Sequence, residues 1–127
     1  MIVCFEDTKN IGTWKLFTWN RPKFGHVYAV QYDPNTDVWI KLECASERMK
    51  VDVFRGEDAD PMIAHIQDNC ICLEVEPIPA ATQLPRWLYC VSLVKHFVGI
   101  KDPFILTPYQ LYCELIRKGC RRIFEPV

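Results

Sequence analysis

Cysteine and histidine carry the reactive chemistry of this 127-residue chain, which has seven cysteines and three histidines. His26 stands apart because it follows Gly25 at the start of a predicted strand, where a side chain meets the rim of a sheet. His65 is expected on a short helix in a surface or half-buried role. His96 follows Cys90 on one predicted helix, but the two side chains point to different sides and cannot be partners. His26 is therefore the candidate general base.

Cys90 is the candidate nucleophile because it lies near the start of a predicted helix that follows Pro85. The backbone N–H groups and the dipole at the start of a helix favour a thiolate, and a neighbouring imidazolium favours it further. The other interpretation of Cys90 is a small core residue, since its neighbours are apolar and free cysteine is among the most buried residue types. Both interpretations fit the periodicity of this segment.

The hairpin that begins at His26 predicts a carboxylate beside the imidazole. A four-residue loop over residues 33–36 is rich in turn-forming residues and pairs Tyr32 with Asp37. The same register places His26 directly opposite Glu43, at the usual Cβ separation of about 5 Å. It also gathers one coherent apolar face, whereas a one-residue slip would scatter apolar side chains over both faces. Glu43 would then hold the imidazole in one tautomer and stabilise its protonated form.

The other cysteines favour neither disulfides nor a metal site. An odd number of cysteines without a secretion signal argues against a disulfide framework. The close pair Cys70 and Cys72 has a one-residue gap, unlike the typical two to four residues of zinc fingers and ribbons. A site completed by Cys113 and Cys120 is the remaining metal hypothesis. Since no phosphate loop, dinucleotide fingerprint or zinc-binding helix motif is present, we predict no metal and no cofactor.

These residues need a sheet and a helix to bring them together, and the sequence predicts both. Half of the chain is apolar and 24% is charged, which is typical of a single packed domain over residues 1–127. The first half is rich in strand patterns and the second half in helix patterns. We therefore predict an α+β fold in which an antiparallel sheet packs against helices. Strands are predicted over residues 26–32, 37–44, 48–54 and 70–76, after a strand-like or irregular segment over residues 14–19.

Three helices are predicted from the signals at their ends. An Asp-Pro start indicates a short helix over residues 60–67. An apolar stripe indicates a second helix that begins near Leu88 and ends at Gly99. A capping box beginning at Thr107 indicates a third helix that continues to Gly119.

The charge pattern argues against nucleic acid and membranes as partners. Fifteen basic and sixteen acidic residues give a formal net charge of −1, so no overall field attracts phosphates. No apolar run approaches the ~20 residues that span a bilayer. The acidic N-terminal segment does not resemble a signal peptide, so we expect a cytoplasmic protein. Four basic residues near the C-terminus fit the last turn of a helix, with phosphate contact as the alternative; they are Arg117, Lys118, Arg121 and Arg122.

The order of these elements resembles one family. A strand-initial histidine in the segment 24–30 comes first, a neighbouring strand ends at 42–45, and a cysteine follows near the start of an apolar helix at 88–94. This order is similar to that of the circularly permuted papain-like cysteine hydrolases, relatives of the NlpC-type peptidases and of lecithin:retinol acyltransferase. The segment 97–112 is similar to small phage-type members. The run around the cysteine differs from that of the acyltransferase branch, so the substrate of that branch is not implied.

The resemblance implies a papain-like domain that acts as a peptidase- or amidase-like thiol hydrolase or as an acyltransferase. Cys90 would be the nucleophile, His26 the general base and Glu43 the group that orients it, with an acyl-enzyme formed from a peptide, amide or other acyl substrate. The backbone N–H of Cys90 would be one oxyanion donor. The candidates for a second donor are Gln83, Trp19 and Tyr28.

The rival hypothesis is a catalytically silent papain-like fold that binds a protein partner, as a phage accessory protein or an inhibitor would. Four tryptophans would line a groove in such a binder or fill the core; they are Trp14, Trp19, Trp39 and Trp87. A binder needs no activated thiol, so the reactivity of Cys90 separates the two hypotheses.

Overall fold

The computed structural model describes residues 1–8, 18, 21–45, 48–78 and 88–125 of the chain. Its elements are β1 (Ile2–Glu6), β2 (His26–Asp33), β3 (Val38–Ala45), β4 (Arg48–Arg55), η1 (Gly56–Ala59), α2 (Asp60–Asn69), β5 (Ile71–Glu74), α3 (Cys90–Val98), α4 (Pro108–Arg117) and β6 (Arg121–Phe124). The six strands form one sheet in the order β4-β3-β2-β1-β5-β6, with every neighbouring pair antiparallel. The predicted α+β class with an antiparallel sheet packed against helices is confirmed.

Caps confirm two of the predicted helix boundaries, the end of α3 and the start of α4, whereas α3 begins at Cys90 instead of near Leu88 and α4 ends at Arg117 instead of Gly119. Gly99 takes the left-handed conformation, with φ of 73°, and ends α3. At the start of α4, Thr107 Oγ1 accepts a hydrogen bond from the Gln110 N–H at 3.3 Å, and Gln110 Oε1 accepts one from the Thr107 N–H at 3.0 Å. These two bonds are the capping box that the sequence predicts.

Two strands of the sheet, β1 and β6, are not among the predicted strands. Strand β1 lies between β2 and β5 at the centre of the sheet, and β6 forms one edge. The segment that was expected to be strand-like, residues 14–19, lies outside the described residues except for Thr18. Strand β1 matters most for the site, because it places Glu6 opposite His26.

The predicted register of the β2–β3 hairpin is wrong by two residues. Tyr32 pairs with Trp39 and Asp33 with Val38, so the four-residue loop covers residues 34–37. The Asp33 carboxylate accepts hydrogen bonds from the Asn35 N–H at 3.0 Å and from the Thr36 hydroxyl at 2.8 Å, which holds the turn one residue later than predicted. Because side chains alternate along a strand, a two-residue shift keeps every side chain on its predicted face.

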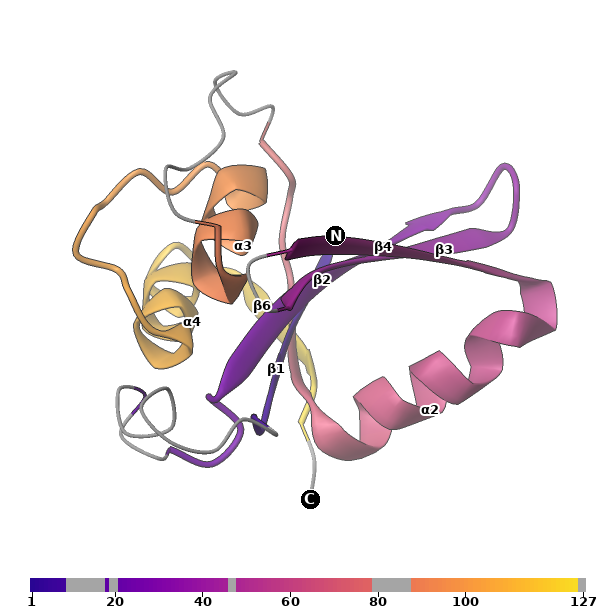
Figure 1. The fold of residues 1–127 in the computed structure, drawn as a ribbon, viewed down its shortest axis with the longest axis horizontal. Helices are drawn as coiled ribbons and strands as arrows, with labels where there is room; N and C mark the ends of the chain where they lie inside the picture. The colour runs from indigo at the N-terminus through magenta and orange to yellow at the C-terminus, as the bar shows by residue number, and fades with distance from the viewer. Residues whose placement is uncertain (9–17, 19–20, 46–47, 79–87, 126–127) are drawn as a thin grey trace.

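The helices α3 and α4 lie on one side of the sheet and α2 lies on the other (Figure 1). The sheet thereby separates two apolar cores. Val27 and Phe5 pack in the core that the sheet shares with α3 and α4. Tyr28 and Cys4 pack in the core that the sheet shares with α2. Alternation along β1 and β2 therefore divides neighbouring side chains between the two layers.

The basic residues near the C-terminus are paired with carboxylates in the chain. Three arginines each lie within 2.7 Å of an acidic oxygen, in the pairs Arg117–Glu114, Arg121–Glu74 and Arg122–Glu125. Local partners thus balance most of the charge of this segment. Among the helices of the described residues, none is long and apolar enough to cross a membrane.

Candidate functional site

A close approach of two chain segments fixes the position of His26. Gly25 donates its N–H to the Glu6 carbonyl at 3.0 Å, just before His26 begins β2. A Cβ atom placed on Gly25 would lie 2.5 Å from the Thr8 backbone nitrogen. Only glycine fits this approach, so the chain before His26 is held against the end of β1.

The predicted contact between His26 and Glu43 is present in spite of the register shift. His26 Nε2 lies 2.8 Å from Glu43 Oε2, and 19% and 15% of the two side chains are exposed. The last observed pair toward His26 is Ala29 with Leu42, and the same register continued by one residue sets Glu43 opposite Tyr28, so the contact with His26 is diagonal instead of direct. Lys41 Nζ lies 3.6 Å from the second carboxylate oxygen, so each oxygen of Glu43 has its own cationic neighbour.

Cys90 is the first residue of α3. Tyr89 is the N-cap residue, and its extended backbone precedes the helix. The Ser92 hydroxyl accepts a hydrogen bond from the Tyr89 N–H at 2.9 Å and donates one to the Tyr89 carbonyl at 3.0 Å. These local bonds fix the start of the helix at Cys90. The thiol thus lies in the first turn, as the nucleophile hypothesis requires, although the residue is only 6% exposed.

The imidazole of His26 joins the thiol and the carboxylate. Burial by itself lowers the pKa of His26, but hydrogen bonds to Cys90 and Glu43 and the charges of both residues raise it to about 9. The hydrogen bond from His26 lowers the pKa of Glu43 to about 2, against the opposite effect of burial and with the help of Lys41. An imidazolium between two acidic groups is therefore the favoured state of His26 near neutral pH.

His26 is also the point at which the two layers of the fold meet. Cys90 belongs to the core beneath α3 and α4. Glu6, which the sheet places opposite His26, bonds through its carboxylate to His65 on α2. One carboxylate oxygen of Glu6, one ring nitrogen of His26 and one carboxylate oxygen of Glu43 all lie within 4.8 Å of one another. A contact network thus runs from α3 through the end of the sheet to α2.

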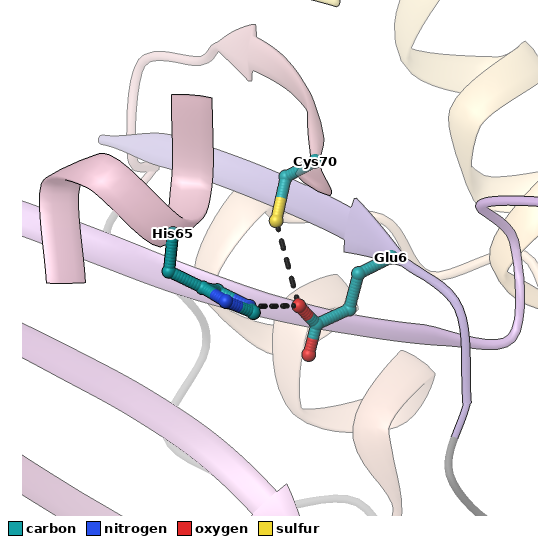
Figure 2. Close-up of side chains that lie close together, drawn as sticks. All are labelled: Glu6, His65 and Cys70. Carbon is teal, nitrogen blue, oxygen red and sulfur yellow. Dashed lines mark hydrogen bonds and ion pairs between the residues drawn. The ribbon is translucent and has the colours of Figure 1, made fainter. Parts of the chain in front are cut away.

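A second cluster, which the sequence did not predict, lies at the end of β1 (Figure 2). Glu6 Oε2 accepts from Cys70 Sγ at 3.5 Å and lies 2.8 Å from His65 Nε2. The sequence predicts only a surface or half-buried role for His65. The missed signal was β1 itself, because a strand over residues 2–6 would have placed Glu6 at a strand end; its neighbours β2 and β5 are known only from the structure.

The structure does not bring the four-thiol set together. Cys70 and Cys72 lie in the core beneath α2, whereas Cys120 packs against the core on the other side of the sheet. Cys113 is exposed. The metal hypothesis that combined these four residues is therefore wrong, because the sheet separates its members.

The other site candidates fall into two groups. Gln83 and Trp19 lie outside the described residues, as do Trp14 and Trp87. The Tyr28 hydroxyl is 3.3 Å from Cys70 Sγ in the core beneath α2, so it is engaged away from the thiol of Cys90.

Comparisons with known proteins add no relative from which a role could be transferred. No family model matches the chain, and neither a curated protein nor a solved structure matches it. The chemistry of the site is accordingly argued from its own contacts.

We predict that His26 titrates near pH 9 and that Glu43→Gln lowers this midpoint, because the variant removes a charged hydrogen-bond acceptor. The imidazole Cε1–H resonance, followed by NMR against pH, measures the midpoint. Because the folded state raises this pKa, the contact stabilises the fold fully below pH ~6.5 and loses its effect as pH rises through about 9. The control is Glu74→Gln, which removes the carboxylate paired with Arg121 at 2.7 Å. A wild-type midpoint at the ordinary histidine value, or one that Glu43→Gln leaves in place, contradicts the assignment.

We predict that Gly25→Ala displaces His26 from Glu43, because the new methyl group would lie 2.5 Å from a backbone atom that cannot move alone. The expected results are a lower His26 midpoint and a loss of about 1–3 kcal/mol of unfolding free energy. Gly119→Ala is the control, since its methyl group meets no atom within 4 Å and brings only the strain of φ at 91°. It should lower stability without moving the His26 midpoint. An unchanged midpoint in Gly25→Ala would show that this approach does not position the imidazole.

Proposed function

We propose that the protein is a thiol hydrolase, peptidase- or amidase-like, or an acyltransferase, built on a permuted papain-like arrangement. Cys90 is the nucleophile, His26 the general base and Glu43 the orienting carboxylate. One observation carries the proposal: Glu43 Oε2 on the neighbouring strand lies 2.8 Å from His26 Nε2, and the thiol at the first residue of α3 is close enough to His26 to raise its pKa. Triads of this kind are recognised by geometry and roles, whatever their order in the chain.

The two ring nitrogens of His26 have different roles in the proposed reaction. Glu43 occupies Nε2 at 2.8 Å, which leaves Nδ1 to exchange a proton with Cys90. A carboxylate on one ring nitrogen fixes the orientation of the ring and stabilises its protonated form. The protonated ring in turn stabilises the thiolate form of a neighbouring thiol. Glu43 acts through His26 and is therefore a positioning residue.

The reaction follows from these roles. The Cys90 thiolate attacks the acyl carbon and forms a C–S bond, while the carbonyl electron pair moves to oxygen. As the tetrahedral intermediate collapses, His26 gives its proton to the leaving amine or alcohol, and an acyl-enzyme remains. His26 then takes a proton from water or from an acceptor alcohol or amine, which attacks the same carbon and releases the thiolate. Water gives hydrolysis, and another acceptor gives acyl transfer.

The start of α3 also supports the oxyanion role that we propose. The first N–H groups of a helix have no carbonyl partner within the helix, and the positive end of its dipole lies there. The N–H of Cys90 would therefore donate to the oxygen that becomes negative when the thiolate attacks. Nothing in these contacts selects one acyl group, so the substrate class remains peptide, amide, thioester or other ester.

One observation favours the alternative of a catalytically silent binding module. Cys90 is 6% exposed and packs in the core beneath α3 and α4. A buried thiol that serves only as a core residue is inert, because alkylating reagents and acyl groups do not reach it. The alternative thus predicts a different reactivity for the same contacts.

We predict that iodoacetamide modifies Cys90 faster than the exposed Cys113, because the imidazolium of His26 stabilises the attacking thiolate. Peptide mass spectrometry against time measures both rates in one sample. Replacing His26 by Ala should slow the modification of Cys90 about tenfold or more and leave Cys113 unchanged. Glu43→Gln should have a smaller effect in the same direction.

Circular dichroism of each variant provides the control that the fold is retained. Cys90→Ala should abolish modification at this position, and His96→Ala, which removes a histidine outside the triad, should leave the rate at wild-type level. If Cys90 is modified no faster than Cys113 in the folded protein, and if His26→Ala leaves that rate unchanged, the catalytically silent binding module is the better description.

A further inference from the structure

The cluster at the end of β1 brings three kinds of metal ligand to one point (Figure 2). Glu6 ends β1, His65 lies on α2, and Cys70 follows α2 directly before β5. Their ligand atoms, one carboxylate oxygen, one imidazole nitrogen and one sulfur, all lie within 4.8 Å of one another. None of the three residues belongs to the proposed triad.

We propose that Glu6, His65 and Cys70 bind a Zn²⁺ ion. Thiolate, imidazole and carboxylate are the three ligand types that zinc takes in proteins. Magnesium and calcium prefer sites made of oxygen alone, so the sulfur and nitrogen select against them. Three protein ligands leave a fourth position of the tetrahedron for water. Binding replaces the S–H bond of Cys70 by a Zn–S bond and releases the proton to solvent.

The distances require only a small adjustment. Metal–ligand bonds of about 2.0–2.3 Å at tetrahedral angles separate the ligand atoms by roughly 3.3–3.8 Å. The sulfur of Cys70 already lies 3.5 Å from Glu6 Oε2, and His65 Nε2 lies 2.8 Å from it. The nitrogen must move away by about 0.5 Å for such geometry. His65 has 48% of its side chain exposed and can turn, whereas Cys70 is fully buried and fixes the sulfur.

Asn69 provides a way to tune the site. Its amide nitrogen lies 3.3 Å from His65 Nδ1 and donates to the His65 carbonyl at 3.0 Å. A histidine that binds a metal through Nε2 carries its proton on Nδ1, which then needs an acceptor. Asn69→Asp supplies a carboxylate at this position. The variant should therefore tighten zinc binding by about tenfold, the lower end of measured outer-shell effects.

The test uses the full chain with Cys90→Ala, so that the thiol beside His26 cannot bind the ion. Isothermal titration with Zn²⁺ should give one ion per chain, and Co²⁺ should show a thiolate-to-cobalt charge-transfer band. His65→Ala should weaken binding about tenfold or more. Cys70→Ser should remove the cobalt band. The matched controls are His96→Ala and Cys113→Ser, which remove the same residue types elsewhere and should leave both readouts unchanged.

Two kinds of outcome would overturn the assignment of zinc to Glu6, His65 and Cys70. Absence of binding, or binding that His65→Ala leaves unchanged, excludes His65 as a ligand. Loss of the ion in Glu43→Gln with retention in His65→Ala would place it on the neighbouring set Glu6, His26 and Glu43. If Cys70→Ser does not fold, the exposed His65 and Asn69 variants still decide the question. Since the readout is metal binding without Cys90, its failure leaves the proposed function untouched.

A second inference rests on a different observation, at the β4 edge of the sheet. Strand β4 is the terminal strand there, and no other described strand pairs with its outer side. Three alternate residues of β4 are exposed apolar side chains, Met49 at 52%, Val51 at 50% and Val53 at 53%. An open edge with an apolar row is a template for pairing with another strand.

We infer that β4 pairs with β4 of a second copy, antiparallel about a two-fold axis at Val51. In this register Met49 lies opposite Val53 and Lys50 lies opposite Asp52 of the other copy, twice by symmetry. A shift by two residues would set Lys50 against Lys50, or Asp52 against Asp52. A shift by one residue would oppose apolar and charged side chains. Over residues 49–53, β4 is thus complementary to itself in this register. Lys50 and Asp52, which lie 3.6 Å apart within one chain, would then each also face the opposite charge of the other copy.

Sedimentation over a range of concentrations tests this dimer with charge exchanges. The wild-type chain should dimerise, and Lys50→Asp or Asp52→Lys should each give monomers, because like charges then face each other. The double variant Lys50→Asp with Asp52→Lys restores opposite pairs and should restore the dimer. Lys118→Asp, which changes an exposed charge after α4, is the control. A monomeric wild type, a dimeric single variant or a monomeric double variant overturns the inference.

Discussion

The imidazole of His26 holds contacts to two acidic groups that come from different layers of the fold. Burial alone would lower the pKa of this imidazole, yet the thiol of Cys90 and the carboxylate of Glu43 outweigh burial and raise the pKa to about 9. The site therefore depends on the two acidic groups staying within hydrogen-bond distance of one ring. Three features hold this geometry in place. Gly25 fixes the chain just before β2, and β3 carries the carboxylate of Glu43. The hydrogen bond between Tyr89 and Ser92 sets Cys90 as the first residue of α3.

Much of this arrangement could be predicted from the sequence because it depends on alternation along strands and on the ends of helices. The face of Glu43 was predicted correctly although its register was wrong, since a two-residue error returns a side chain to the same face. The diagonal distance remains within reach of long side chains such as Glu and His. The turn was predicted one residue too early. Asp33 is the last residue of β2, and its carboxylate accepts hydrogen bonds from two residues of the turn. Residue propensities alone do not show which of several adjacent turn-forming residues begins the turn.

The part that could not be predicted depends on pairing between distant segments. Strand β1 has only five residues, and its apolar run gave no alternation from which to recognise a strand with two buried neighbours. Its position between β2 and β5 brings Glu6 to His65 and Cys70, which are 59 and 64 residues away in the chain. No local pattern in the sequence predicts a contact between residues so far apart in the chain. The sheet also keeps Cys70 and Cys72, in the core beneath α2, apart from Cys120, which packs against the core on the other face.

The two interpretations of Cys90 are not exclusive in the folded protein. The residue packs in the core beneath α3 and α4, and its thiol is still near enough to the imidazole of His26 to raise the pKa of that histidine. The reason is the direction of side chains on a helix, because each Cα–Cβ bond tilts toward the N-terminus. At the first helical residue this tilt carries the side chain beyond the N-terminal end of the helix, while the apolar stripe continues in the other direction through Val94 and Val98. A cysteine one turn later would be enclosed by that stripe, so the proposed reactive role of Cys90 depends on where the Tyr89 cap begins the helix.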